Sequence, residues 1–208
     1  MTGKKSGMNS SKRVDGAGQS QPRWLAMGSL FTAGGVLVGL NALFILLVAF
    51  GNITDFETNQ AFVHHVLSMD TANFGAPVGQ GLDSAVMWHA VGSNPLQNAA
   101  YVGIIAWELL AGVALAAATI WWFAGSVRRR TRARALATIG LTMIVVLFVG
   151  GFLAVGGEWF QMWRSSDWNG SEAAFRSAVI ALFALLVIHL PAATDAGTAA
   201  VDAHAGDG

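Results

Sequence analysis

Cysteine is absent from the 208-residue sequence, and charged residues are scarce. Without thiols the chain can form no disulfide, no thiolate metal site, no iron–sulfur cluster and no covalently attached haem. Charged residues make up 12% of the chain and hydrophobic residues 54%, whereas soluble domains have about 25% charged residues. Basic and acidic residues balance at twelve each, so no net positive field would recruit nucleic acid. The expected environment is a lipid bilayer.

Four long apolar segments contain most of the hydrophobic residues. The first, from Trp24 to Phe50, has no charged residue, and about 20 helical residues suffice to cross the roughly 30 Å hydrocarbon core. We therefore predict an all-α, four-helix transmembrane bundle in residues 24–191. Residues 1–23, which are basic and rich in Gly and Ser, and residues 192–208 are expected to be disordered tails. The predicted spans are residues 24–50, 98–123, 135–157 and 173–191.

Positive charge is concentrated on one side of the predicted spans. Ten of the twelve Lys and Arg residues lie in the N-terminal tail and in the connection between spans two and three, where five arginines occur between Arg128 and Arg134. The two other connections are rich in Asp and Glu. By the positive-inside rule, both tails and the arginine connection are predicted to be cytoplasmic (N-in, C-in), and the acidic connections face outward. The chain is therefore expected to cross its membrane several times, with both ends in the cytoplasm.

The first outward connection, residues 51–97, is too long for a simple turn and contains signals for helices. Thr54 and Glu57 match a capping box ahead of an apolar helical face, which predicts a short helix near residues 55–69. A second short helix is expected to start at Asp83 or the next residue. The connection is therefore predicted to be structured, with one or two short helices.

Glu108 is an ionisable residue inside the second predicted span. At the centre of a membrane helix such a residue costs at least about 2.5 kcal/mol on insertion scales, and it marks a functional site by default. Arg176 lies about one turn inside span four, and its long side chain is predicted to reach Glu108 or Glu158. The Glu108–Arg176 pair either fixes the register of the helices or forms a proton or ligand site. The structural role is favoured, because one pair provides no proton relay.

Imidazoles and carboxylates, the groups that bind zinc or copper, gather in the outward connections. The candidates are His64, His65, Asp70, His89 and Glu158. Adjacent His64 and His65 point about 100° apart on a helix, and no H-x-x-x-H or H-E-x-x-H pattern occurs, so no metal site is predicted. The histidines are expected at the boundary between helices and lipid headgroups instead. His189 is the only histidine in a predicted span, and no haem or other cofactor is predicted.

Tryptophans crowd the second outward connection, at Trp159, Trp163 and Trp168. Tryptophan is enriched where a membrane meets water. An aromatic belt at this interface is therefore favoured over a pocket for a ligand or a quinone.

Small residues in the first span predict a close contact between helices. Gly35 and Gly39 form a G-x-x-x-G step, which lets the backbone of another helix approach closely. Asn41, in the same span, is a candidate for a hydrogen bond across this contact. The partner helix belongs either to the same bundle, which is slightly favoured, or to another subunit.

Three strings of residues carry a resemblance to a known family. They are NITDFETNQAFVHHVLSMD after span one, MWHAVGSNPLQNAAY at the start of span two, and GGEWFQMWRSSDWNGSEAAFR between spans three and four. Over about residues 25–190 the chain resembles a family of predicted small bacterial integral membrane proteins, a domain of unknown function. The resemblance implies a four-helix protein of the bacterial inner membrane. It implies no reaction, cofactor or catalytic residue.

Three hypotheses of function follow from these residues. The leading one is a non-enzymatic subunit or accessory protein of an inner-membrane complex, because no nucleotide-binding loop, nucleophile elbow or kinase signature is present. It would contact lipid and either a membrane-protein partner or a second copy, through its outward loops and small-residue helix faces. One alternative is a small transporter or proton-linked protein that uses Glu108 and Arg176. The other is an outward-facing metal or redox site.

Overall fold

The structure, a computed structural model, describes residues 28–191, in which helices occur and no strand does. Four helices are long and apolar enough to cross a membrane: α1 (Leu30–Thr54), α3 (Asn94–Ala124), α4 (Val127–Val145) with its continuation η3 (Val146–Trp159), and α5 (Ser171–His189). The shorter helices are α2 (Phe56–Ser68), η2 (Met87–His89) and η4 (Met162–Arg164). The predicted all-α architecture with four spans is confirmed. The predicted tails, residues 1–23 and 192–208, lie outside the described residues.

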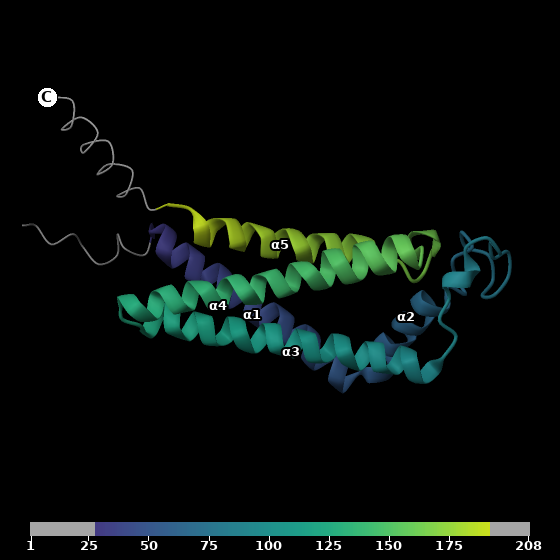
Figure 1. Ribbon diagram of the computed structural model, residues 1–208, viewed down its shortest axis with the longest axis horizontal. Coiled ribbons are helices and arrows are strands. Elements are labelled where there is room, and N and C mark those ends of the chain that lie inside the picture. Colours follow the sequence, from purple (N-terminus) through teal and green to yellow (C-terminus); the bar gives the residue numbers. More distant parts are fainter. Residues whose placement is uncertain (1–27, 192–208) are drawn as a thin grey trace, which may run out of the picture.

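The spanning helices pack in a ring: α1 contacts α3, α3 contacts α4, α4 contacts α5, and α5 contacts α1. Successive spanning helices run in opposite directions (Figure 1). Large apolar side chains such as Leu47 and Leu110 are exposed on the outside. This arrangement suits a bilayer, where small residues allow helices to approach and large ones contact lipid tails. The inward face of α5 is a row of alanines at helical spacing: Ala174, Ala178, Ala181 and Ala184.

The junction between α1 and α2 differs from the predicted capping box. The Thr54 hydroxyl donates to the Phe50 carbonyl at 2.9 Å, and Thr54 is the last residue of α1. Asp55 stands at the N-cap position of α2 and makes no capping bond with its side chain. The first span continues beyond the predicted end at residue 50, because the apolar face of α1 extends to Ile53. Only one residue thus separates α1 from α2.

Two further connections differ from the prediction: the one between α3 and α4 is shorter, and the one between α2 and α3 is less helical. The arginines from Arg128 to Arg134 lie in the first turns of α4 and not in a loop, so that only Gly125 and Ser126 join α3 to α4. Arginine is a good helix former, and α4 starts directly after Ser126, whose side chain makes no capping bond. The predicted second short helix is reduced to the single turn η2. Asp83 Oδ1 accepts the Ala85 backbone N–H at 3.0 Å, which favours a turn there instead.

The bundle is closed at one end and open at the other. The closed end holds Arg128–Arg134 and is called the arginine end; the open end holds residues 55–93 and 160–170 and is called the loop end. The Trp107 indole N–H donates to the Met143 carbonyl at 2.9 Å, near the point where α4 gives way to η3. The close packing of α3 is against α4 and does not continue along η3. In Figure 1 the α1–α3 layer diverges there from the α4–α5 layer, and α2 lies between them at the right of the view.

The helix η3 is a π-helix, whose hydrogen bonds reach five residues back, as from Phe160 N to Val155 O at 2.9 Å. Two glycine pairs interrupt its apolar sequence, Gly150–Gly151 and Gly156–Gly157. A π-helix is rare as a long segment and is found frequently at functional sites. The open half of the bundle therefore contains a helix that is wider than an α-helix and that carries two pairs of glycines.

The G-x-x-x-G step of α1 packs against α3 inside the bundle. A Cβ atom at Gly35 would lie 2.5 Å from Phe123 Cζ and 2.6 Å from Trp122 Cδ1, and one at Gly39 would lie 3.2 Å from Thr119 Cγ2. Trp122 is itself fixed, because it is buried and its indole N–H donates to the Phe31 carbonyl at 2.9 Å. The glycines therefore set the distance between α1 and α3 within one chain.

Asn41 does not form the predicted bond between helices. Its Nδ2 donates to the Leu37 carbonyl of its own helix at 2.9 Å, and its buried Oδ1 has no partner among the described residues. The preceding turn of the same helix offers a carbonyl at close range, so the amide N–H group is satisfied locally.

Replacement of Gly35 by alanine is expected to destabilise the fold. The added methyl group would press on Trp122, which cannot move without losing its hydrogen bond, and overpacking of this kind costs about 1–3 kcal/mol. Gly51→Ala is the matched control, because it lies in the same helix and a Cβ there would meet no atom within 4 Å. Unfolding by SDS titration in mixed micelles measures the difference. Equal stability of the two variants would contradict the close α1–α3 contact.

Candidate functional site

Glu108 is held by a hydrogen bond from the end of α1. The glutamate is 2% exposed, and Asn52 Nδ2 donates to its Oε2 at 2.8 Å. The other oxygen, Oε1, receives no hydrogen bond from residues 28–191 and is not fully enclosed. The carboxylate is therefore buried and held through one oxygen, while the other oxygen has no hydrogen-bond donor among the described residues; we call Oε1 the open oxygen.

Tyr101 fixes the position of Asn52. It lies two helical turns before Glu108 on α3, and its hydroxyl donates to the Asn52 carbonyl at 3.1 Å. The Phe56 ring at the start of α2 packs on the Tyr101 ring, with 4.7 Å between ring centroids. Both the backbone and the side chain of Asn52 are thus tied to α3, and the start of α2 is tied there as well.

A cavity of about 550 Å³ lies next to Glu108, between α1, α2, α3, η3 and α5. We call it the carboxylate cavity. Its walls are mainly apolar, and Glu108 and Arg176 are the charged residues among those that line it. Two of its lining residues, Phe44 of α1 and Ile180 of α5, are exposed at 38% and 52%, so the cavity lies close to the outer surface of these helices. Its aromatic lining consists of Phe44, Phe62, Tyr101, Phe148 and Phe152.

Arg176 and Glu108 line the same cavity, but the structure does not join them in the predicted ion pair. Arg176 Nη1 lies 3.3 Å from Glu172 Oε1, one turn earlier on α5, and both side chains are largely exposed, at 67% and 84%. The local i,i+4 partner keeps the arginine at the mouth of the cavity. Glu158, the other predicted partner, is exposed on η3.

Asn52 is the site residue that the sequence alone does not single out. The first span is predicted to end at residue 50, which leaves Asn52 in the connection. Its bond to Glu108 joins positions 56 residues apart in the sequence. A signal is nevertheless present, because Asn52 and Ile53 continue the uncharged run of the span before Asp55.

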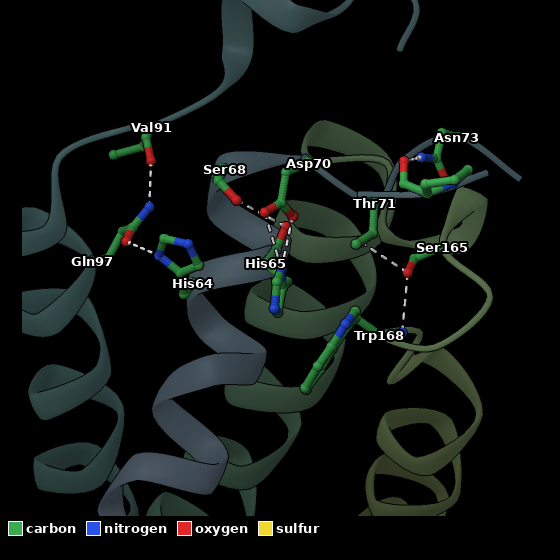
Figure 2. Close-up of polar contacts among 11 residues, drawn as sticks. His64, His65, Ser68, Asp70, Thr71, Asn73, Val91, Gln97, Ser165 and Trp168 are labelled. Atoms are coloured by element: carbon green, nitrogen blue, oxygen red, sulfur yellow. Dashed lines mark hydrogen bonds and ion pairs between the residues drawn. The ribbon is translucent and has the colours of Figure 1, made fainter. Parts of the chain in front are cut away.

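His64 and Gln97 form a polar contact at the loop end. Figure 2 shows His64 Nδ1 facing Gln97 Oε1, at 2.7 Å, while Gln97 Nε2 donates to the Val91 carbonyl at 2.6 Å. Gln97 is 1% exposed. The contact links α2 to the first turn of α3 and to the chain that leads into it.

His65 pairs with Asp70, as the same view shows. His65 Nδ1 lies 2.8 Å from Asp70 Oδ1, and the imidazole stacks on the Trp168 ring with 4.6 Å between centroids (Figure 2). Ser165 Oγ donates to Thr71 Oγ1 and accepts the Trp168 backbone N–H, both at 3.0 Å. The two connections that were predicted to face outward are therefore joined to each other.

The five predicted polar residues of the loop end do not converge on one point. His89 Nδ1 lies 2.7 Å from the Trp159 carbonyl, and its ring stacks on Trp159 at 4.5 Å. His64 and His65 bond to different partners, Gln97 and Asp70. Among the described residues no group of three or more His, Asp or Glu side chains could hold a metal ion. The imidazoles stabilise the loop packing.

The Arg164 side chain packs near two further aromatic rings of the loop end, those of Trp163 and Phe74. Its guanidinium lies 5.3 Å from the Trp163 ring centroid and 5.5 Å from that of Phe74. Its Nη1 donates to Asp83 Oδ2 at 3.3 Å. The pKa of Asp83 lies below its usual value, because the Ala85 backbone N–H and then Arg164 donate to the charged carboxylate. The tryptophans of the second connection thus pack on different parts of the first.

The carboxylate cavity is the part of the molecule best suited to bind a ligand. An oxygen that lacks a donor, in an apolar and aromatic cavity, attracts a cation by charge and through the faces of the rings. At the loop end, by contrast, the histidines are engaged with neighbouring groups, and the buried atoms without a partner among the described residues, Gln161 Oε1 and Arg164 Nε, do not line this cavity. We therefore take the carboxylate cavity as the candidate site.

The comparisons with known proteins agree with the fold. Residues 31–191 match the model of a family described as predicted small integral membrane proteins, DUF2165. No curated protein and no solved structure matches the chain. The match covers nearly all of α1 and the whole of the other spanning helices, together with both connections at the loop end. The chain belongs to this family of small integral membrane proteins.

Proposed function

We propose that this protein is a non-enzymatic accessory protein of the bacterial inner membrane, which binds a positively charged amphipathic molecule in the carboxylate cavity. The observation that carries the proposal is the open oxygen of Glu108, Oε1, at the wall of this apolar space. A buried carboxylate of this kind needs a cation or a proton to offset the loss of hydration.

The balance of charge around the cavity favours a cationic ligand. Arg176 has its own counter-ion, because Glu172 lies one turn away on the same helix. Among the described residues, the hydrogen-bond partner of Glu108 is the neutral amide of Asn52. The interior of the cavity therefore has one uncompensated negative charge when Glu108 is ionised.

The apolar walls favour an amphipathic ligand over a simple inorganic cation. Aromatic side chains from α1, α2 and η3 surround the space beside the carboxylate, and they offer no set of oxygen ligands to a hard metal ion. They do offer ring faces to an ammonium group and hydrocarbon surface to its substituents. Entry beside the exposed Phe44 and Ile180 side chains would give such a molecule access from the bilayer.

Replacement of Glu108 by glutamine tests the proposal. Glutamine keeps the size of the side chain and can still accept from Asn52, so the fold is expected to persist. The probe is tritiated n-dodecylamine, measured against n-dodecanol with protein in lipid nanodiscs and corrected with empty nanodiscs. Loss of a charge-assisted hydrogen bond of about 1.5–3 kcal/mol should weaken amine binding by roughly ten- to a hundredfold, with little effect on the alcohol.

Glu57→Gln is the control for this experiment, because Glu57 is an exposed carboxylate on α2. It should bind dodecylamine as the unchanged protein does. If Glu108→Gln binds the amine with unchanged affinity while remaining folded, the carboxylate is not the recognition group. The proposal would then be wrong.

The orientation in the membrane is also part of the proposal: the arginine end is cytoplasmic and the loop end faces outward. The support is the cluster of five arginines in the first turns of α4, because basic residues that flank a span favour the cytoplasmic side. Single cysteines can report the orientation, because the chain has none. A membrane-impermeant maleimide should label Ser84→Cys in intact cells, and Thr131→Cys only after permeabilisation. The reverse pattern would overturn the orientation.

A partner protein is the second candidate, and the exposed aromatic residues of the loop end favour it. Trp88 is 71% exposed and Phe74 is 69% exposed, although the connection that holds them is tied down by hydrogen bonds. Gly35 and Gly39 are unavailable to a partner because they pack on α3. The accessory role would therefore use the loop end.

Purification in a mild detergent tests the partner. We expect a second chain, another membrane protein or a second copy, to be retained by the unchanged protein and by Leu186→Ala, which alters an exposed residue of α5. It should be lost from Trp88→Ala. Light scattering that shows a single chain in every preparation would contradict a stable partner.

A further inference from the structure

A second opening leads out of the bundle between α3 and η3. It is a groove of about 490 Å³, on the side where these two helices diverge. Gly103 of α3 and Gly150 and Gly151 of η3 lie in its walls, and the other lining residues are apolar as well. Trp107, bonded to Met143, closes the groove toward the arginine end.

The groove and the carboxylate cavity are neighbours of a third space beneath α2. A smaller space of about 210 Å³ lies between them, and the apolar face of α2 contributes Phe62, Val63 and Leu67 to its wall. This space shares Phe62 and Phe152 with the carboxylate cavity and Gly151 with the groove. Ile104 lines all three. The three spaces therefore lie side by side from Glu108, under α2, to the outer surface, and we call this row of spaces the passage.

The width of the passage and its apolar lining determine what kind of molecule can occupy it. A helix of another subunit is about 10–12 Å wide with its side chains, and it cannot enter the small space under α2. In the small space and the groove the lining side chains offer water no free polar group, because the Trp107 N–H is bonded to Met143, and apolar cavities of this kind stay dry. A hydrocarbon chain is thin and flexible, and it requires no hydrogen bonds.

We propose that the ligand is a long-chain amine or another cationic lipid, whose hydrocarbon chain leaves the carboxylate cavity beneath α2 and lies in the α3–η3 groove. This inference rests on the proposed function, because the ammonium group at Glu108 anchors the chain. The glycines of the groove have a role in this arrangement: they leave the width that a chain requires.

A photoreactive probe tests where the chain lies. The probe is dodecylamine with a diazirine at the far end of its chain, bound to the protein in lipid nanodiscs, irradiated and located by mass spectrometry of the labelled peptides. We expect labels on groove residues of α3 and η3, such as Val146 and Gly150. A butylamine diazirine should instead label residues of the carboxylate cavity.

Gly103→Leu is the variant that blocks the groove. A Cβ at Gly103 would meet no atom within 4 Å, so the leucine can be accommodated and fills the groove from the α3 side. Groove labelling by the dodecylamine probe should be lost in this variant and retained in Gly51→Leu, a helical glycine with equally open surroundings outside the groove. Gly150→Leu blocks the opposite wall and serves as a second test if Gly103→Leu does not fold.

The outcomes separate this inference from the proposed function. Labels on Ala173 or Ile180 of α5 that disappear in Glu108→Gln would leave the cationic ligand in place but overturn the route of its chain. Groove labels that are equally strong with a dodecanol diazirine would show an ordinary bilayer chain in the groove, and would also overturn it. Scattered labels that do not depend on Glu108 would contradict both proposals.

Discussion

The open half of this bundle depends on the hydrogen bond between Asn52 and Glu108. The bond pins the end of α1 to α3 inside the membrane domain, and the Tyr101 hydroxyl secures the same residue through its carbonyl. Because Asp55 alone separates α1 from α2, the second helix has to start at this fixed point. It then runs between the two layers of helices (Figure 1). The place of the carboxylate, the path of α2 and the cavity beneath it are thus consequences of one anchored junction.

The two ends of the bundle are built from different residues. Toward the arginine end, Gly35 and Gly39 bring α1 and α3 close together, and the Trp122 ring fills the contact. Toward the loop end, phenylalanines line a space between the helices, and η3 has the geometry of a π-helix. In a bilayer no hydrophobic force expels lipid from between helices, so a gap lined by apolar residues is open to lipid chains. Close contacts between helices therefore fill one half of the bundle, whereas the gap in the other half is available to an amphipathic ligand.

Hydropathy is sufficient to find the four spans, because an uninterrupted apolar run of about 20 residues is rare in a protein that folds in water. Glu108 stands out in the sequence for the same reason, as a charge within such a run. Its hydrogen-bond partner, Asn52, does not stand out in the sequence. Whether Glu108 pairs with Asn52 or with Arg176 depends on where α1 ends and on which face of α5 carries Arg176. Neither can be read from the spacing of residues in the sequence. Arg176 has a nearer partner in Glu172, and the capping box fails because Thr54 bonds backward to its own helix. The geometry of the candidate site is therefore determined by contacts between side chains that lie far apart in the sequence.

The central claim is that the Glu108 carboxyl group faces a cavity that is reached from the bilayer and holds a cation. Dicyclohexylcarbodiimide, a membrane-soluble reagent that adds to carboxyl groups, measures this most directly when native membranes are treated and the protein is then mapped by mass spectrometry. We predict modification at Glu108, slowed by dodecylamine and unaffected by dodecanol. A Glu108 that stays unmodified, or that reacts equally fast with and without the amine, would contradict the claim.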